Sequence, residues 1–106
     1  MAKPHREEIL RDLNVLQLFG NLARRPLSAP LRDKIFELRS TKDEIQYRTL
    51  YFFWKGRMII VSHIIVKKTQ RVPNEEIAKA IKNLASWIGR FGGPRNGEEE
   101  RKRRKK

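Results

Sequence analysis

The sequence predicts an α+β fold in which a small antiparallel sheet of three strands is flanked along the chain by an N-terminal and a C-terminal helix. Apolar residues recur at helical spacing near both ends of residues 1–89. Between them lie three short runs rich in β-branched and aromatic residues. For this order of elements we expect an antiparallel sheet with both helices packed on one side.

The first helix is expected over residues 4–19. Pro4 suits a first helical turn, because its missing N–H has no partner to lose there. Apolar residues then follow at near-helical spacing up to Phe19, and Gly20 is a stop signal. The proline-containing stretch 21–30 is expected to be a loop.

The three strands are expected at residues 35–39, 46–54 and 58–66. Lys55-Gly56 forms a turn signal between the last two, which predicts a β-hairpin. The run 58–66 is almost continuously apolar. A strand of that kind is typical of the buried centre of a sheet, so we expect it to be the central one.

The second helix is expected over residues 74–89. Asn74 is a favourable N-cap residue, and two glutamates follow it in the first turn. A single apolar stripe then runs along one helix face through Ile77, Ile81, Leu84 and Ile88.

Composition narrows the possible functions. Of the 106 residues, 25 are Lys or Arg and 12 are Asp or Glu, which gives a net charge of +13 and favours a polyanionic partner. The chain has no cysteine, which excludes a disulfide scaffold, a thiolate metal site and a cysteine nucleophile. His5 and His63 lie far apart in sequence, so no metal site is expected. Without an apolar run of about 18 residues or a secretory signal, we expect a cytoplasmic protein that does not bind membranes.

The charge divides the chain into an expected domain at residues 1–89, with a net charge of +8, and a tail at 90–106, with a net charge of +5. Residues 98–106 of the tail are all charged and have nothing apolar to bury, so we expect the tail to be disordered. Two interpretations of its basic block remain open: an arm that binds RNA phosphates, or a solvated end. The residues considered for RNA binding there are Arg101, Arg103 and Arg104.

Cationic side chains cluster in and just after the expected strands. They are Arg39, Arg48, Lys67, Lys68 and Arg71, with His63 among them. Strand alternation puts Arg48 on the face of Leu50, Phe52 and Trp54, and His63 on the face of Ile59, Val61 and Ile65. Such a surface would suit RNA phosphates and could stabilise charge on a phosphoryl group. The alternative for His63 is a core histidine held by hydrogen bonds, and for the cations a solvated surface.

Four sequence elements in order resemble the phage-derived RelE/HigB-like toxin family of type II toxin–antitoxin modules, within the RelE/ParE superfamily. They are FELR (36–39), YRTLYFF (47–53), HIIVKKTQ (63–70) and PNEEIAKA (73–80). The resemblance covers roughly residues 27–88. No single element is specific, but their order and spacing together are.

The resemblance implies an endoribonuclease that cleaves mRNA on the ribosome without a metal or other cofactor, and a helix-turn-helix antitoxin as partner. The implied reaction is attack of the 2′-hydroxyl on the adjacent phosphate. By matching position, the catalytic candidates are Arg48, His63, Lys67 and Lys68, with Arg39 and Arg71 binding RNA. His63 or Lys67 would transfer the proton.

The chain departs from the family pattern in three ways. It lacks the usual first strand before the first helix, it has Ile64 after the strand histidine, and it carries the basic tail. Two alternatives therefore stay open. One is a noncatalytic toxin fold that binds RNA or an antitoxin, and the other is a gyrase poison of the ParE type.

Overall fold

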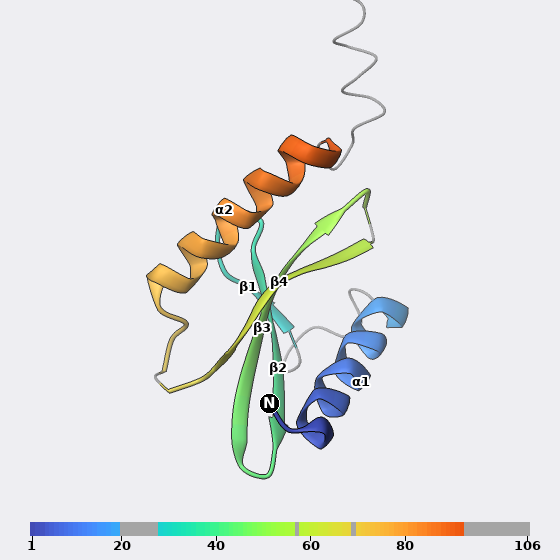
Figure 1. Cartoon of the computed structure of the whole chain (residues 1–106), viewed down its shortest axis with the longest axis vertical. Coiled ribbons are helices and arrows are strands. Elements are labelled where there is room, and N and C mark those ends of the chain that lie inside the picture. Colours follow the sequence, from blue (N-terminus) through green and yellow to red (C-terminus); the bar gives the residue numbers. More distant parts are fainter. Residues whose placement is uncertain (20–27, 57, 69, 93–106) are drawn as a thin grey trace, which may run out of the picture.

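The computed structural model describes residues 1–19, 28–56, 58–68 and 70–92 (Figure 1). In chain order the elements are α1 (Lys3–Phe19), β1 (Ser28–Pro30), β2 (Phe36–Lys42), β3 (Ile45–Trp54), β4 (Met58–Val66) and α2 (Asn74–Phe91). The strands form one antiparallel sheet in the order β1-β2-β3-β4. The α+β class is thus confirmed, but the expected number of strands was wrong. The short strand β1 lies within the stretch expected to be a loop and pairs with β2, with Ser28 opposite Leu38.

The connection between β2 and β3 consists of two residues, and the other two connections in the sheet are longer. Each of the three contains two adjacent residues with positive φ angles: 53° and 70° at Asp33-Lys34, 52° and 68° at Asp43-Glu44, and 55° and 84° at Lys55-Gly56. This backbone matches the right-handed twist of paired strands and makes a tight hairpin. Only the turn at Lys55-Gly56 has a strong sequence signal, which is why the first hairpin was missed.

The two helices cover opposite faces of the sheet, so the expected one-sided packing was wrong (Figure 1). Leu50 and Tyr51 are neighbours in β3 and therefore point to opposite faces. Leu50 packs in a cluster with Ala80 and Leu84 of α2. Tyr51 packs in a second cluster with Leu16 of α1. The fold is therefore a three-layer arrangement with one small core on each side of the sheet.

The most buried strand is β3, and not β4 as expected. Residues 47–52 of β3 are all buried, since β3 has a strand on each side and a helix on each face. In the described sheet β4 lies at the edge, and its side chains at Val61, Ile64 and Val66 are 41%, 39% and 47% exposed. An apolar run thus reflects a strand, but it does not specify the position of that strand in the sheet.

A β-bulge at Ser62 changes which residues of β4 share a face. Leu50 lies opposite His63, whereas its neighbour Tyr51 lies opposite Val61, so Ser62 is the extra residue. Residues directly opposite each other in a sheet share a face. His63 therefore points to the α2 face, and Val61 to the α1 face. The expectation that they share a face was wrong, because strict alternation fails at the bulge.

The N-terminus of α2 lies next to the site described below. Pro73 occupies the cap position, and no side chain caps the helix, so the expected N-cap at Asn74 was wrong. Glu75 and Glu76 lie in the first turn, where the helix dipole favours negative charge. The helix runs two residues beyond its expected end, to Phe91. No helix in the described part of the chain is long and apolar enough to cross a membrane.

Asp12 on α1 provides a test of the packing between α1 and the sheet. Burial raises the pKa of the Asp12 carboxyl above its usual value. The folded protein therefore binds this proton more tightly than the unfolded chain, and stability falls as pH rises through the folded-state pKa. We expect Asp12→Asn to raise the melting temperature at pH 7, and this gain to vanish near pH 3.

The matched control for this prediction is Asp33→Asn, which makes the same chemical change at a side chain that is 63% exposed. Circular dichroism melts of both variants at several pH values provide the measurement. A lower melting temperature for Asp12→Asn at pH 7 would contradict the prediction.

Candidate active site

A cavity of about 540 Å³ opens where β2, β3, the segment after β4 and the start of α2 meet. We call it the cationic cavity, because five cations line it: Arg32, Arg39, Arg48, Lys67 and Arg71. Four of them, all except Arg32, were candidates from the sequence. They come from three separate stretches of chain, which the antiparallel pairing of β2, β3 and β4 brings together.

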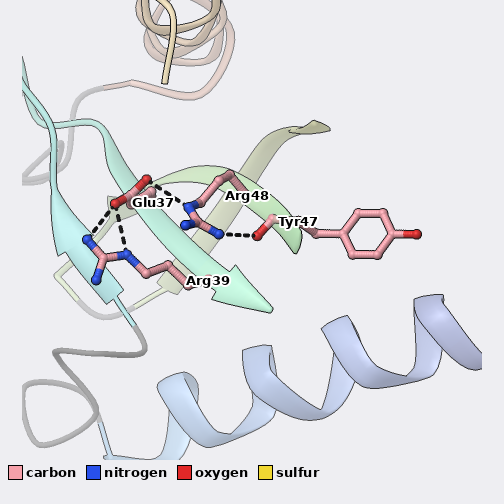
Figure 2. A network of polar contacts seen from close by, with 4 residues as sticks. All are labelled: Glu37, Arg39, Tyr47 and Arg48. Atoms are coloured by element: carbon pink, nitrogen blue, oxygen red, sulfur yellow. Dashed lines mark hydrogen bonds and ion pairs between the residues drawn. The ribbon is translucent and has the colours of Figure 1, made fainter. Parts of the chain in front are cut away.

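Glu37 organises two of these cations (Figure 2). Its Oε2 accepts hydrogen bonds from Nε and Nη2 of Arg39, at 3.1 and 2.9 Å. Its Oε1 lies 3.4 Å from Nε of Arg48. In the sheet Arg39 lies directly opposite Arg48, and Glu37 is two residues before Arg39, so all three side chains share the α2 face. The carboxylate thus bridges both guanidinium groups.

Arg48 is held on a second side by the backbone. Its Nη1 donates a hydrogen bond to the carbonyl of Tyr47 at 3.0 Å, while the Tyr47 ring points away from the network (Figure 2). Burial lowers the pKa of Arg48, Glu37 raises it, and the positive charge of Arg39 lowers it again. Arginine still stays protonated at physiological pH. The site therefore presents a fixed positive charge.

The charges lining the cationic cavity are unbalanced. Five cations accompany one carboxylate, Glu37, among the lining residues. The side chains of Glu37 and Arg48 are each only 9% exposed, so their charges interact in a medium of low dielectric constant. Such an arrangement favours the binding of an anion with several oxygen atoms, such as a phosphate group.

A second cavity of about 460 Å³ adjoins the first and shares Arg48, Lys67 and Arg71 with it. We call it the apolar cavity, because Ile65, Val72 and Pro73 form part of its wall. Lys68 lines this second cavity, together with a third at the end of β4, but not the cationic cavity. Lys67 lines all three, so it lies at their junction.

His63 lies outside the lining of these cavities. Its Nε2 is 2.9 Å from Oε1 of Glu76, and its Nδ1 is 2.8 Å from Oγ of Ser62. Asn83 donates a hydrogen bond to the same Ser62 oxygen at 2.7 Å. With Nε2–H donating to the carboxylate, the Ser62 hydroxyl donates to Nδ1 and both nitrogens of a neutral imidazole are satisfied. His63 thus links β4 to α2, and its catalytic role stays a prediction.

A family model described as Phage derived protein Gp49-like (DUF891) matches residues 1–85. The match includes α1, the whole sheet and most of α2. The chain belongs to the Gp49-like family. This membership is compatible with a toxin of a toxin–antitoxin module. A comparison with curated proteins finds no match.

The Gp49-like match contains every residue that lines the three cavities. The tail lies beyond it. The tail candidates for RNA binding, Arg101, Arg103 and Arg104, lie outside the residues that the structure describes. Among the described residues, no cluster of three or more His, Asp or Glu side chains could hold a metal ion.

The candidates from the sequence did not include Glu37 or Arg32. Glu37 had a detectable signal, because an acid two residues before Arg39 in a strand must share its face. Acidic residues are rarely buried unless paired, so its place in an apolar strand also pointed to a paired carboxylate. Arg32 follows β1, a strand that the sequence analysis did not predict. Nothing in the sequence around Arg32 therefore pointed to the site.

Proposed function

We propose that this Gp49-like protein is the toxin of a type II toxin–antitoxin module and cleaves mRNA on the ribosome. The observation that supports the proposal most strongly is the cationic cavity, where Arg39 and Arg48 are held by one buried carboxylate and Lys67 and Arg71 stand beside them. Preorganised cations of this kind stabilise charge that develops on a phosphoryl group.

The proposed reaction is attack by the 2′-hydroxyl on the adjacent phosphate. A bond forms between O2′ and phosphorus, and the bond to O5′ breaks, leaving a 2′,3′-cyclic phosphate and a 5′-hydroxyl. One proton leaves the 2′-hydroxyl and one is taken up by O5′. Arg39 and Arg48 would hold the nonbridging oxygens, and Arg71 would bind the neighbouring phosphate.

We assign proton transfer to Lys67. It lines the cationic cavity, where its ammonium group can donate a proton to the leaving O5′, whereas the arginines around it keep their protons. His63 is the less favoured candidate, because its Nε2 is bound to Glu76. Lys68 would add positive charge from the adjoining cavity. Glu37 acts as a positioning residue for the two arginines.

The proposal includes a helix-turn-helix antitoxin as partner. The exposed apolar side chains of Val61, Ile64 and Val66 on β4 support it, since exposed apolar surface of this kind marks sites of protein association. Lys67 and Lys68 follow directly, so an acidic partner segment would fit there. Failure of the protein to co-purify with a small helix-turn-helix protein encoded beside it would count against this partner.

Induced expression followed by mapping of mRNA 5′ ends tests the proposal. We expect growth arrest together with discrete cuts that are in phase with codons. Arrest without cuts would instead support the alternative of a gyrase poison, which a supercoiling assay would then examine. Neither arrest nor cuts would support the noncatalytic alternative, for which binding to RNA should weaken as salt concentration rises.

A further inference from the structure

The apolar cavity differs from the cationic cavity in its chemistry. Ile65 from β4 and Val72 and Pro73 from the segment before α2 supply apolar wall. Its volume of about 460 Å³ lies within the range of about 300–1,000 Å³ that is usual for small-molecule sites. Apolar walls beside an arginine suit a planar base, because a guanidinium plane stacks on the face of a base.

One carboxylate, Glu76, is found among the residues that line the apolar cavity. Its Oε1 accepts the hydrogen bond from His63 and lies 3.8 Å from Nζ of Lys79. Both of these contacts involve Oε1, and the Glu76 side chain is 29% exposed. The carboxylate group therefore retains an acceptor for a ligand that enters this cavity.

The orientation of Glu76 is set by a chain of hydrogen bonds. Asn83 donates to Ser62 at 2.7 Å. With the neutral His63 tautomer described above, Ser62 donates to His63 and His63 donates to Glu76, at 2.8 and 2.9 Å. The chain depends on the β-bulge, which turns His63 toward α2. A bulge that re-aims a side chain is typical of functional sites. His63 is thus a positioning residue for an acceptor that faces ligand.

We propose that the apolar cavity binds a nucleobase that carries an exocyclic amino group, with Glu76 accepting the hydrogen bond from that amino group. The inference rests on the proposed function, because the shared residues Arg48, Lys67 and Arg71 would hold the phosphate attached to the same nucleotide. The inferred base site would explain why the proposed nuclease binds some RNA sequences more tightly than others.

The chemistry of the bases gives the preference its direction. Adenine, cytosine and guanine present amino groups, which donate to a carboxylate. Uracil presents carbonyl oxygens in place of an amino group, and a carbonyl beside a carboxylate is repelled. The Glu76 side chain is 29% exposed, so a base that lacks the amino donor loses one charge-assisted hydrogen bond but does not leave a fully buried acceptor unpaired.

Binding of oligonucleotides that cannot be cleaved provides the test. Fluorescence anisotropy would compare 2′-O-methyl hexamers of A, C and U, because methylation removes the nucleophile and separates binding from turnover. We expect the A and C hexamers to bind at least about fivefold more tightly than the U hexamer, as expected for one specific hydrogen-bonded contact. Glu76→Gln should bring the ratio close to one, because glutamine can also donate to a uracil carbonyl.

Two further variants make the result specific. Glu75→Gln makes the same charge change at the exposed neighbouring residue and should leave the ratio unchanged. His63→Gln should lower the ratio without removing binding, because it disturbs the orientation of Glu76 and leaves the cations in place. It also keeps the inference testable if Glu76→Gln fails to fold.

Three outcomes would overturn the inference. The first is a wild-type ratio near one, and the second is a ratio that Glu76→Gln does not change. The third is absence of binding of all three hexamers at low salt. These failures differ from a failure of the proposed function. Base-selective binding without cleavage of ribosome-bound mRNA would contradict the proposed nuclease activity but would still support the inferred base site.

Discussion

Lys67→Ala is expected to reduce the rate of mRNA cleavage by about 10²- to 10⁴-fold, the usual contribution of a positioned proton-transfer group. Lys67 lies at the junction of the three cavities, so its ammonium group has access to both the phosphate and the leaving oxygen proposed above. Its backbone N–H donates to Gln46 at 2.8 Å, and alanine keeps that bond. We therefore expect the fold and its stability to change little.

The measurement is the rate at which purified protein cleaves mRNA on programmed ribosomes, with growth arrest as the cellular readout. Lys82→Ala is the matched control, because it removes the same charge from an exposed position on α2 that lines none of the described cavities. Equal losses in the two variants would mean that Lys67 contributes only general charge. An unchanged rate of mRNA cleavage in Lys67→Ala would contradict the proton-transfer role of Lys67.

Replacing Glu37 is expected to have the largest effect on stability. Glu37→Leu leaves Arg48 buried without its carboxylate, and breaking a buried ion pair from one side costs about 3–5 kcal/mol. Urea unfolding, followed by circular dichroism, measures the change in the free energy of unfolding. Arg39→Gln should cost less, about 1 kcal/mol or below, because the Arg39 side chain is 31% exposed and solvent screens its charge.

A double variant separates the ion pair from the packing at the same place. Glu37→Leu combined with Arg48→Met removes both charges, so no buried charge is left without a partner. We expect this double variant to be more stable than Glu37→Leu alone, although it should be inactive because Arg48 is missing. The single variant Arg48→Met completes the comparison. If the losses of unfolding free energy in Glu37→Leu and Arg48→Met add up to the loss in the double variant, Glu37 and Arg48 do not act as a pair.

Patterns that are local in sequence predicted the local structure well. The bounds of α1 and the start of α2 lie within one residue of those expected, and the β3–β4 hairpin formed at Lys55-Gly56. Arg48 lies on the face of Leu50 and Phe52, as alternation predicted, because β3 contains no bulge of its own there. The structure brings Arg39, Arg48, Lys67 and Arg71 around one cavity, and their role in binding RNA stays a prediction.

Apart from the cap and the end of α2, the main errors were in features that depend on distant parts of the chain. β1 was missed because three residues carry too little pattern, and they form a strand only by pairing with β2. β4 was expected at the centre of the sheet, but the order of strands depends on which edges find partners and not on apolarity alone. The bulge at Ser62 reversed the face of His63 relative to Val61.

The sequence by itself determined the class of the fold, the positions of its helices and of the three longer strands, and the cationic character of the molecule. Hydrophobic period and turn residues act over a few positions, so they can be recognised along the chain. Only the tertiary structure decided that Glu37 bridges two arginines and that His63 contacts Glu76 and lies outside the lining of the cavities. Those contacts join residues on different elements, and a carboxylate or an imidazole takes its role from the groups that burial brings within hydrogen-bonding distance.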